Sequence, residues 1–340
     1  MKPILLSVII ITHNQREEFR RCLESVLAQD LPFEHEIIIS DDHSTDGTWE
    51  LIGEYVANYP GLIQGYQCNS DDCHPANNSH RSGWNRCNAY PYARGKYIAH
   101  VDADDYFRPG SDVYKRQVEM LERHPECSLC MANIYRLNEG QNLAEGRPWH
   151  GKGVFSEGEV IDKHDFVRRN IFILNQAFMQ RRNPDADPVA LYGRRYVDSV
   201  ITFHHLQFGS VVCVDACDYV YVQHTGSIAN TVAQTKDRVV LWCLGLYIPA
   251  LIPYWRHDYC IGGLNGIREV VSLARSGYCL SEQSQHSLDG LDMYIYHVFG
   301  RERRWYDEIR LFITTQWIRL MQRFHFKSHF ATDILHWLLK

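Results

Sequence analysis

Short apolar runs recur in the N-terminal part of the chain, each bounded by polar or turn-forming residues. Residues 7–12 and 36–40 are rich in isoleucine, and residues 62–66 and 97–101 are runs of similar length. Runs this short are typical of buried strands rather than of helices. We therefore expect four strands in this part of the chain.

Two segments between these runs show helical periodicity. The first places apolar side chains at i, i+3, i+4, i+7 and i+8, namely Phe19, Cys22, Leu23, Val26 and Leu27. The second places Ile52, Tyr55, Val56 and Tyr59 on one face. Strands that alternate with amphipathic helices predict a mostly parallel sheet with right-handed crossovers.

The following part of the chain continues this pattern. We expect a helix over residues 111–123, a strand over 128–135 and a glycine-rich loop over 138–158. Two further strands are expected over 211–214 and 219–222. The remainder of the chain has the pattern of helices.

Polar and acidic side chains directly follow three of the predicted strands. They are Thr12-His13-Asn14, Asp41-Asp42 and Asp102-Ala103-Asp104-Asp105. The carboxyl ends of parallel strands lie at one edge of a sheet, where open α/β sheets bind ligands. Carboxylates this close repel one another unless a cation or several donors compensate them. The last cluster therefore predicts a cation site, and a polar turn is the alternative interpretation.

Charge and cysteine content narrow the class of protein. The chain has 340 residues and a formal net charge of −6, and its basic residues form no block before residue 300. A surface that tracks nucleic-acid phosphates is therefore not expected. The eleven cysteines lack regular spacing, which indicates free thiols in the cytosol. Cys127 and Cys130 form a CxxC pair, but no second pair stands at the spacing of a zinc site.

Two C-terminal segments bear on membrane association. Residues 239–255 approach the length of a membrane span, but Pro249 and Pro253 interrupt them, and we interpret them as a kinked helix. Residues 301–340 carry eight Lys and Arg against four Asp and Glu, with apolar side chains at helical spacing. This pattern is typical of a helix on an anionic bilayer surface, and an amphipathic helix packed on the domain explains it equally.

Several stretches of the chain occur together in a specific order. They are SVIIITHN, LESVLAQ, EIIISDDHSTDGT, ARGKYIAHVDADD and a later Asp followed by a His. Over residues 4–230 this order resembles that of the family 2 glycosyltransferases of bacterial surface-polysaccharide synthesis. The resemblance implies the GT-A fold, an α/β, Rossmann-like architecture with a mostly parallel central sheet flanked by helices. A helical C-terminal extension would follow it.

The same resemblance divides the chain into three parts. Residues 1–110 would form the nucleotide-sugar-binding half of the GT-A domain, and residues 111–230 the acceptor-binding half. Residues 231–340 would form a helical C-terminal region that is amphipathic and basic at its end.

The resemblance also implies how the donor is held. The donor would be a nucleotide-diphosphate sugar, with UDP favoured as the nucleotide, and the cofactor would be Mn²⁺ or Mg²⁺. Thr12 and Asn14 would line the base pocket, Asp41 would contact the base, and Asp42 would lie beside it. Asp102 would face the ribose.

The resemblance also assigns roles to the other two carboxylates of the acidic cluster and to two basic side chains. Asp104 would ligate the metal, and His224 would complete the metal or diphosphate site, which favours manganese because imidazole suits Mn²⁺ better than Mg²⁺. Asp105 is either an acceptor-side or a structural residue. Arg86 is expected at the diphosphate, although Cys87 stands where many members of the family have Asn.

Asp198 corresponds to the general base of inverting members of the family. This chain departs from the family at Val197, where Glu is frequent. An Asp that only stabilises a helix N-terminus explains the position as well. A Gln-x-x-Arg-Trp motif of processive members is not present in the sequence, so transfer of a single sugar is expected.

These observations predict a cytoplasmic, metal-dependent, inverting glycosyltransferase of the hexosyl or N-acetylhexosaminyl class. It would transfer one sugar to a hydroxyl of a glycan or a lipid-linked glycan, as a peripheral protein at the inner face of the cell membrane. A homodimer through the helical C-terminal region is a further hypothesis. The alternatives are an inactive nucleotide- or glycan-binding module of the same fold and a sugar nucleotidyltransferase. The latter would need a glycine-rich loop after the first strand, where residues 12–16 contain no glycine.

Overall fold

The computed structural model describes seven segments of the chain. They are residues 2–68, 81–150, 155–162, 165–166, 174–183, 198–206 and 208–224. The chain forms two compact units, Met1–Asp162 with Ile173–Thr225, and Lys163–Phe172 with Gly226–Lys340. Every helix and strand described here belongs to the first unit.

Segments 239–255 and 301–340, for which the sequence suggested a kinked helix and an amphipathic helix, lie outside the described residues. Within the segments that the structure does describe, no helix is both long enough and apolar enough to cross a membrane.

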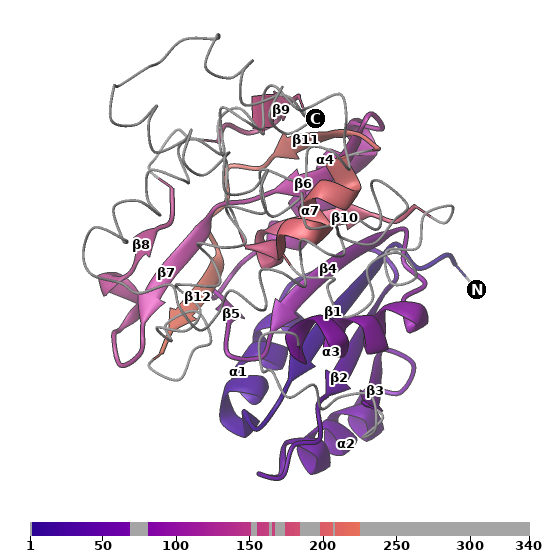
Figure 1. Ribbon diagram of the computed structural model, residues 1–340, viewed down its shortest axis with the longest axis vertical. Helices are drawn as coiled ribbons and strands as arrows, with labels where there is room; N and C mark the ends of the chain where they lie inside the picture. Colours follow the sequence, from indigo (N-terminus) through magenta and orange to yellow (C-terminus); the bar gives the residue numbers. More distant parts are fainter. Residues whose placement is uncertain are drawn as a thin grey trace, which may run out of the picture. The chain divides into compact units, whose positions relative to one another are not determined.

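The N-terminal part of the first unit alternates strands and helices, as the apolar pattern predicts (Figure 1). Its elements are β1 (Leu6–Thr12), α1 (Arg16–Leu27), β2 (His35–Asp41), α2 (Thr48–Asn58), β3 (Ile63–Gln67), α3 (Arg81–Ala89) and β4 (Tyr97–Asp102). The apolar stripe of α1 is buried, since Phe19, Cys22 and Leu23 are fully inaccessible to solvent. Only α3 lies in a segment for which the sequence predicted no element.

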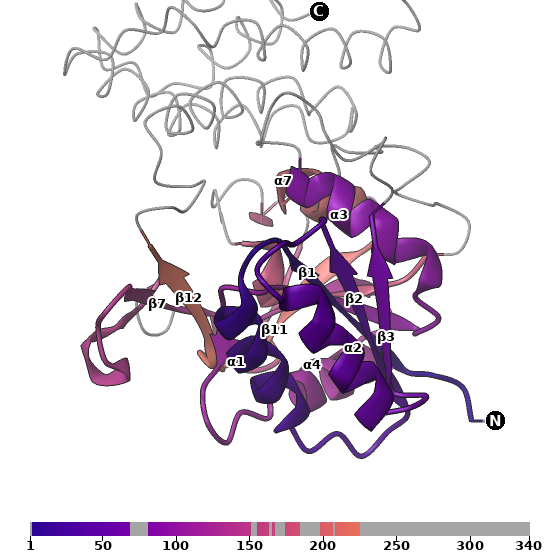
Figure 2. The same ribbon diagram turned by 90° about the horizontal axis from the view of Figure 1, so that it is seen from below.

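The central sheet has eight strands in the order β3-β2-β1-β4-β10-β6-β11-β9. The elements of its second half are α4 (Val113–Arg123), β6 (Cys127–Met131), β9 (Val160–Ile161), β10 (Phe178–Arg181), α7 (Asp198–Leu206) and β11 (Ser210–Cys213). β10 runs antiparallel to β4 and β6, and β9 runs antiparallel to β11, while the other pairs are parallel. Helices α1 and α2 cover one face of this sheet, and α3 and α7 cover the other (Figure 2).

A second sheet corrects two of the sequence-based expectations. It joins β5 (Tyr106–Phe107), β12 (Tyr219–Gln223), β7 (Ile134–Asn138) and β8 (Arg147–Pro148). The single strand expected over 128–135 is therefore two strands, β6 and β7, which belong to different sheets. The chain changes sheet at Asn133, whose side chain bonds to the backbone of His150 through its amide nitrogen at 2.9 Å and its oxygen at 3.2 Å. The segment expected to be a loop over 138–158 contains β8.

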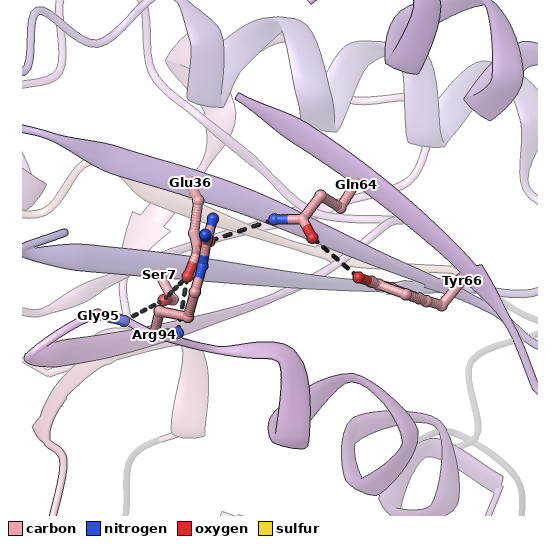
Figure 3. A network of polar contacts seen from close by, with 6 residues as sticks. All are labelled: Ser7, Glu36, Gln64, Tyr66, Arg94 and Gly95. Carbon is pink, nitrogen blue, oxygen red and sulfur yellow. Dashed lines mark hydrogen bonds and ion pairs between the residues drawn. The ribbon is translucent and has the colours of Figure 1, made fainter. Parts of the chain in front are cut away.

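A buried carboxylate ties the strands together at their amino ends (Figure 3). Glu36 on β2 is fully buried and accepts hydrogen bonds from the Ser7 hydroxyl at 2.7 Å and the Gln64 amide at 3.2 Å. Arg94 donates to the same carboxylate from its backbone nitrogen at 2.7 Å and from Nη2 at 2.6 Å. The Ser7 hydroxyl in turn accepts the Gly95 amide at 2.8 Å. One side chain thus connects β1, β2, β3 and the segment that enters β4.

Replacing Glu36 with Gln is expected to destabilise the protein measurably. The amide keeps the shape of the side chain but removes the charge and turns one acceptor into a donor that faces Arg94. We expect the free energy of unfolding to fall by about 1–3 kcal/mol in urea denaturation of the full-length protein. Glu122→Gln is the matched control, because the Lys96–Glu122 pair is half exposed and contributes less than about 1 kcal/mol. Equal losses in the two variants would contradict a special role of the buried carboxylate.

Candidate active site

The pairing of three parallel strands brings the predicted polar clusters to one edge of the sheet. In this register Thr12 on β1 lies opposite Asp41 on β2, and Ile11 lies opposite Asp102 on β4. The backbone continues the pattern beyond the strands, since the Asp42 amide donates to the Thr12 carbonyl at 3.0 Å. The three strand ends therefore form one continuous polar edge.

Asp41 lies at the β2 end of this edge and is fully buried. One of its carboxylate oxygens accepts the Ser44 amide at 3.1 Å and the Gln67 side chain at 3.1 Å, and the other accepts the Ser44 hydroxyl. A carboxylate has about four acceptor positions, so it can accept a further donor from a ligand. Neither Ser44 nor Gln67 was singled out from the sequence: Ser44 lies in the turn after β2, and Gln67 lies on the neighbouring strand β3.

Thr12 and Asn14 lie at the β1 end of the same edge. The Thr12 hydroxyl is buried and has no hydrogen-bond partner among the described residues. Asn14 adopts a left-handed backbone conformation with φ 51°, and its side-chain oxygen accepts the Thr45 amide at 2.7 Å. The backbone N–H of Asn14 donates to the Ser44 hydroxyl at 2.8 Å. The turns after β1 and β2 are therefore locked to each other.

Asp102 at the end of β4 is held by two side chains. Arg86 on α3 donates to one carboxylate oxygen at 2.6 Å, and the Gln176 amide donates to the other. Arg86 is 3% exposed, whereas the Asp102 side chain is 29% exposed and can be reached from outside. The sequence had suggested a diphosphate contact for Arg86, and the structure places its guanidinium against Asp102. Gln176 was not predicted, because it lies in an isolated turn of 3₁₀ helix, Asn175–Ala177, with no local pattern.

Asp104 and His224 meet although they are far apart in the sequence. His224 Nε2 lies 3.0 Å from Asp104 Oδ2, and both side chains are about a quarter exposed, at 26% and 23%. The hydrogen bond that His224 makes to the Asp104 carboxylate raises the pKa of His224, and burial opposes this shift.

The Asp104–His224 pair has the donor types and spacing of a divalent cation site. Neighbouring ligands of an octahedral cation bonded at about 2.1 Å stand about 3 Å apart, as this nitrogen and this oxygen do. A carboxylate oxygen suits Mg²⁺ or Mn²⁺, and the imidazole nitrogen suits Mn²⁺ better. The residues present therefore fit such a metal.

Asp105 occupies an internal position. It is 1% exposed, and its carboxylate oxygens accept the Tyr219 hydroxyl and, at 2.8 Å, the Val222 amide. Burial raises the pKa of Asp105, and the charges of Asp104 and Asp102 raise it further. Because both oxygens bond to β12, this geometry favours the structural interpretation of Asp105 over the acceptor-side one.

Asp198 is the first residue of α7 as the structure describes this helix. The conformation of its side chain and the preceding Val197 lie outside the described residues. Its assignment as a general base therefore stays a prediction. The helix itself is anchored by Ile201, which is fully buried against the face of the sheet that α3 also covers.

The CxxC pair does not form a metal site. Cys127 and Cys130 both lie on β6, where residues three apart point to opposite faces of the sheet. Among the described residues, the structure joins no two cysteines in a disulfide.

Comparison with known sequences identifies the family to which the chain is similar. The model of Glycosyl transferase family 2 matches residues 7–198. An uncharacterized protein of Mycobacterium tuberculosis is 29% identical over 246 residues, which cover 70% of this chain and 63% of that protein. A UDP-Glc:alpha-D-GlcNAc-diphosphoundecaprenol beta-1,3-glucosyltransferase of Escherichia coli is 34% identical over 103 residues, which cover 30% of this chain and 36% of that enzyme. The chain thus spans less than two thirds of the length of these curated relatives.

Comparison with solved structures supports the fold. The crystal structure of S. aureus TarS 1–349 in complex with UDP-GlcNAc has a TM-score of 0.59 and covers 87% of this chain and 82% of that chain. The two sequences are 18% identical, so the similarity concerns the fold alone. The predicted α/β architecture of the GT-A type is thereby confirmed.

Two substitutions of Asp105 distinguish a structural role from a role toward the acceptor. Asp105→Ala leaves the Tyr219 hydroxyl and the Val222 amide buried without a partner, and we expect it to lower the free energy of unfolding by about 2–4 kcal/mol. Asp105→Asn retains an acceptor for Val222 and a polar group at Tyr219, so less than half of that loss is expected. Urea denaturation of the full-length protein measures both. Wild-type stability of Asp105→Ala would contradict the structural assignment.

Proposed function

Since the chain belongs to glycosyl transferase family 2, we propose that it transfers one sugar from a UDP-sugar to a hydroxyl of a glycan or lipid-linked glycan, with inversion at the anomeric carbon. The observation that carries this proposal is the meeting of Asp104 and His224 at 3.0 Å, two residues beyond Asp102, at the edge of the sheet where Asp41 also ends a strand. This edge of the sheet offers acceptors for the base and ribose, and a cation site for the diphosphate.

The nucleoside would lie along the ends of β1, β2 and β4. Asp41 has the acceptor capacity to take a base N–H, and the Thr12 hydroxyl, which has no hydrogen-bond partner among the described residues, would turn toward the base. Asn14 and Asp42 would shape the pocket around it. Asp102 would accept a ribose hydroxyl, and Arg86 would act by holding this carboxylate in place.

Asp104 and His224 would hold the cation, with Mn²⁺ favoured over Mg²⁺. The bound metal would neutralise charge on the diphosphate as it leaves with the nucleotide. The guanidinium of Arg86, which the sequence suggested for the diphosphate, pairs with Asp102 at 2.6 Å. Its contribution to the donor would therefore be made chiefly through Asp102.

Asp198 would act as the general base at the start of α7. Its carboxylate would take the proton of the acceptor hydroxyl while the oxygen attacks the anomeric carbon, and the nucleoside diphosphate would leave from the opposite face. Holding both substrates converts a bimolecular reaction into an effectively unimolecular one. This role is inferred from the position of Asp198 in the family motif.

The relatives support the substrate classes of this proposal. The name of the Escherichia coli relative states a UDP-Glc donor and a diphosphoundecaprenol-linked acceptor, and the S. aureus structure contains UDP-GlcNAc. A lipid-linked acceptor fits the basic residues 301–340, which would hold the protein peripherally at the cytoplasmic face of the membrane. With such an acceptor, the protein would act in surface-polysaccharide synthesis.

Removal of the metal should weaken nucleotide binding. We expect UDP to bind wild-type protein at least about tenfold more tightly with Mn²⁺ than with EDTA, in isothermal titration calorimetry. Asp104→Asn should bind UDP with one affinity in both conditions, because the proposed cation ligand is lost. Asp30→Asn, on the exposed turn after α1, is the matched control and should keep the difference. Full metal dependence in Asp104→Asn would refute this assignment.

The general base is tested by turnover rather than by binding. With a UDP-sugar and an acceptor present, Asp198→Asn should release UDP about 10²–10⁴-fold more slowly than the wild type, while its affinity for UDP stays unchanged. Asp30→Asn should keep the wild-type rate. Wild-type turnover by Asp198→Asn would exclude it as the base. Absence of UDP release by the wild type across donors and acceptors that bind would instead favour the inactive-module alternative.

A further inference from the structure

The two faces of the second sheet differ in character (Figure 1). On one face, Leu137 and Val222 belong to a buried apolar cluster. On the neighbouring strands Tyr221 pairs with Arg136, which in turn pairs with Arg147. Paired residues point to the same face, and side chains alternate along a strand, so these three side chains lie on the face opposite to the apolar cluster. The second sheet thus has one apolar face and one polar face.

A small cavity lies on the polar face, where β7 and β12 end at Asn138 and Gln223. Its volume is about 170 Å³, and six residues line it, namely Arg136, Asn138, Gln141, Glu145, Arg147 and Gln223. None of these described lining residues is apolar. The cavity is smaller than the usual pockets for whole small ligands, so it would take one ring of a larger molecule.

The cavity offers both hydrogen-bond donors and acceptors to a ligand. Gln141 accepts the backbone N–H of Asn138 through Oε1 at 2.9 Å, and its Nε2 is left for a ligand. Glu145 accepts the backbone N–H of Asn142 through Oε2 at 2.8 Å, and its other oxygen is left. The exposed side chains of Asn138 and Arg147 form no hydrogen bond or ion pair within the described segments. Backbone bonds therefore orient part of the lining and leave its polar atoms able to bind hydroxyl groups.

An aromatic side chain lies beside the cavity. The guanidinium of Arg136, a lining residue, lies over the Trp149 ring at 5.5 Å from its centre, and the Tyr221 ring meets Trp149 edge to face at 5.9 Å. Trp149 is partly exposed. A sugar ring carries C–H groups on its faces and hydroxyls at its edge, so aromatic rings and planar polar groups bind it together. The polar face of the second sheet has both kinds of group.

We propose that this polar face binds the acceptor glycan, with the hydroxyls of one sugar in the cavity and an adjoining part of the glycan against Trp149. This inference rests on the proposed function, which makes a glycan the acceptor. Gln223 lines the cavity and directly precedes His224, the candidate cation ligand. A glycan held on β7, β8 and β12 would therefore extend toward the place of the donor diphosphate.

Direct titration with saccharides tests the surface. Full-length protein in saturating UDP and Mn²⁺, which fill the donor site, is titrated by calorimetry with oligosaccharides of glucose, galactose or N-acetylglucosamine, each with and without a phosphate group. We expect saturable binding of at least one of them, weakened at least about fivefold by Asn138→Ala and by Arg147→Ala. Neither side chain makes a described polar contact, so both variants should fold. Arg123→Ala is the matched control, exposed on α4 and outside the cavity, and should keep the wild-type affinity.

The outcomes separate this surface from the transfer reaction. Absence of saturable binding by all of these oligosaccharides, or equal weakening by Arg123→Ala, would overturn the glycan surface. With an acceptor that is turned over, Asn138→Ala and Arg147→Ala should raise the acceptor KM at least about fivefold and leave the affinity for UDP unchanged. An unchanged acceptor KM would overturn the surface and leave the transfer reaction standing. Saccharide binding with the expected variant effects, but without UDP release, would support the surface and contradict the transfer reaction.

Discussion

The in-register pairing of β1 with β2 and β4 is the constraint on which the polar edge depends. Thr12 faces Asp41 and Ile11 faces Asp102 because the three strands end at the same level. A shift by one residue would turn every buried side chain of a strand to the other face of the sheet. Glu36 opposes such a shift at the amino ends, where its direct partner in the register is Ser7. Gly95 belongs to the same anchor, since a Cβ there would lie 2.5 Å from the Ser7 backbone nitrogen.

The second sheet positions residues that are distant in the sequence next to the end of β4. β12 pairs with β5 directly after Asp105, and the buried Asp105 carboxylate bonds to both Tyr219 and Val222. This attachment places the residue that follows β12, His224, beside Asp104. The buried carboxylate therefore supports the exposed one by fixing the strand that carries its partner.

The sequence predicted those parts of the structure that are determined by residues close together in the chain. The strands from β1 to β4 and the helices α1 and α2 follow from apolar periodicity, and the polar strand ends follow from the same pattern. The separation of β6 from β7 could not be read from residues 128–135, because the parts of both strands that fall in this range are mainly apolar and only Asn133 marks the change of sheet. Gln176 and Tyr219 were missed for a related reason: their partners, Asp102 and Asp105, are distant in the sequence. The pairing of Asp104 with His224 was suggested by resemblance to a family, not by any local pattern.

Asp102, Asp104 and Asp105 differ in which groups compensate their charge. This difference decides which of them can bind a cation. Asp105 is buried with both oxygens bonded inside the fold, so a cation there would have to break two hydrogen bonds. Asp102 has one oxygen on Arg86 and the other on Gln176, and a cation would also be repelled by the guanidinium. Asp104 shares one partly exposed hydrogen bond with an imidazole, which becomes a metal ligand when it loses its proton. Of these three carboxylates, Asp104 is therefore the one that a divalent cation can bind at the least cost to the fold.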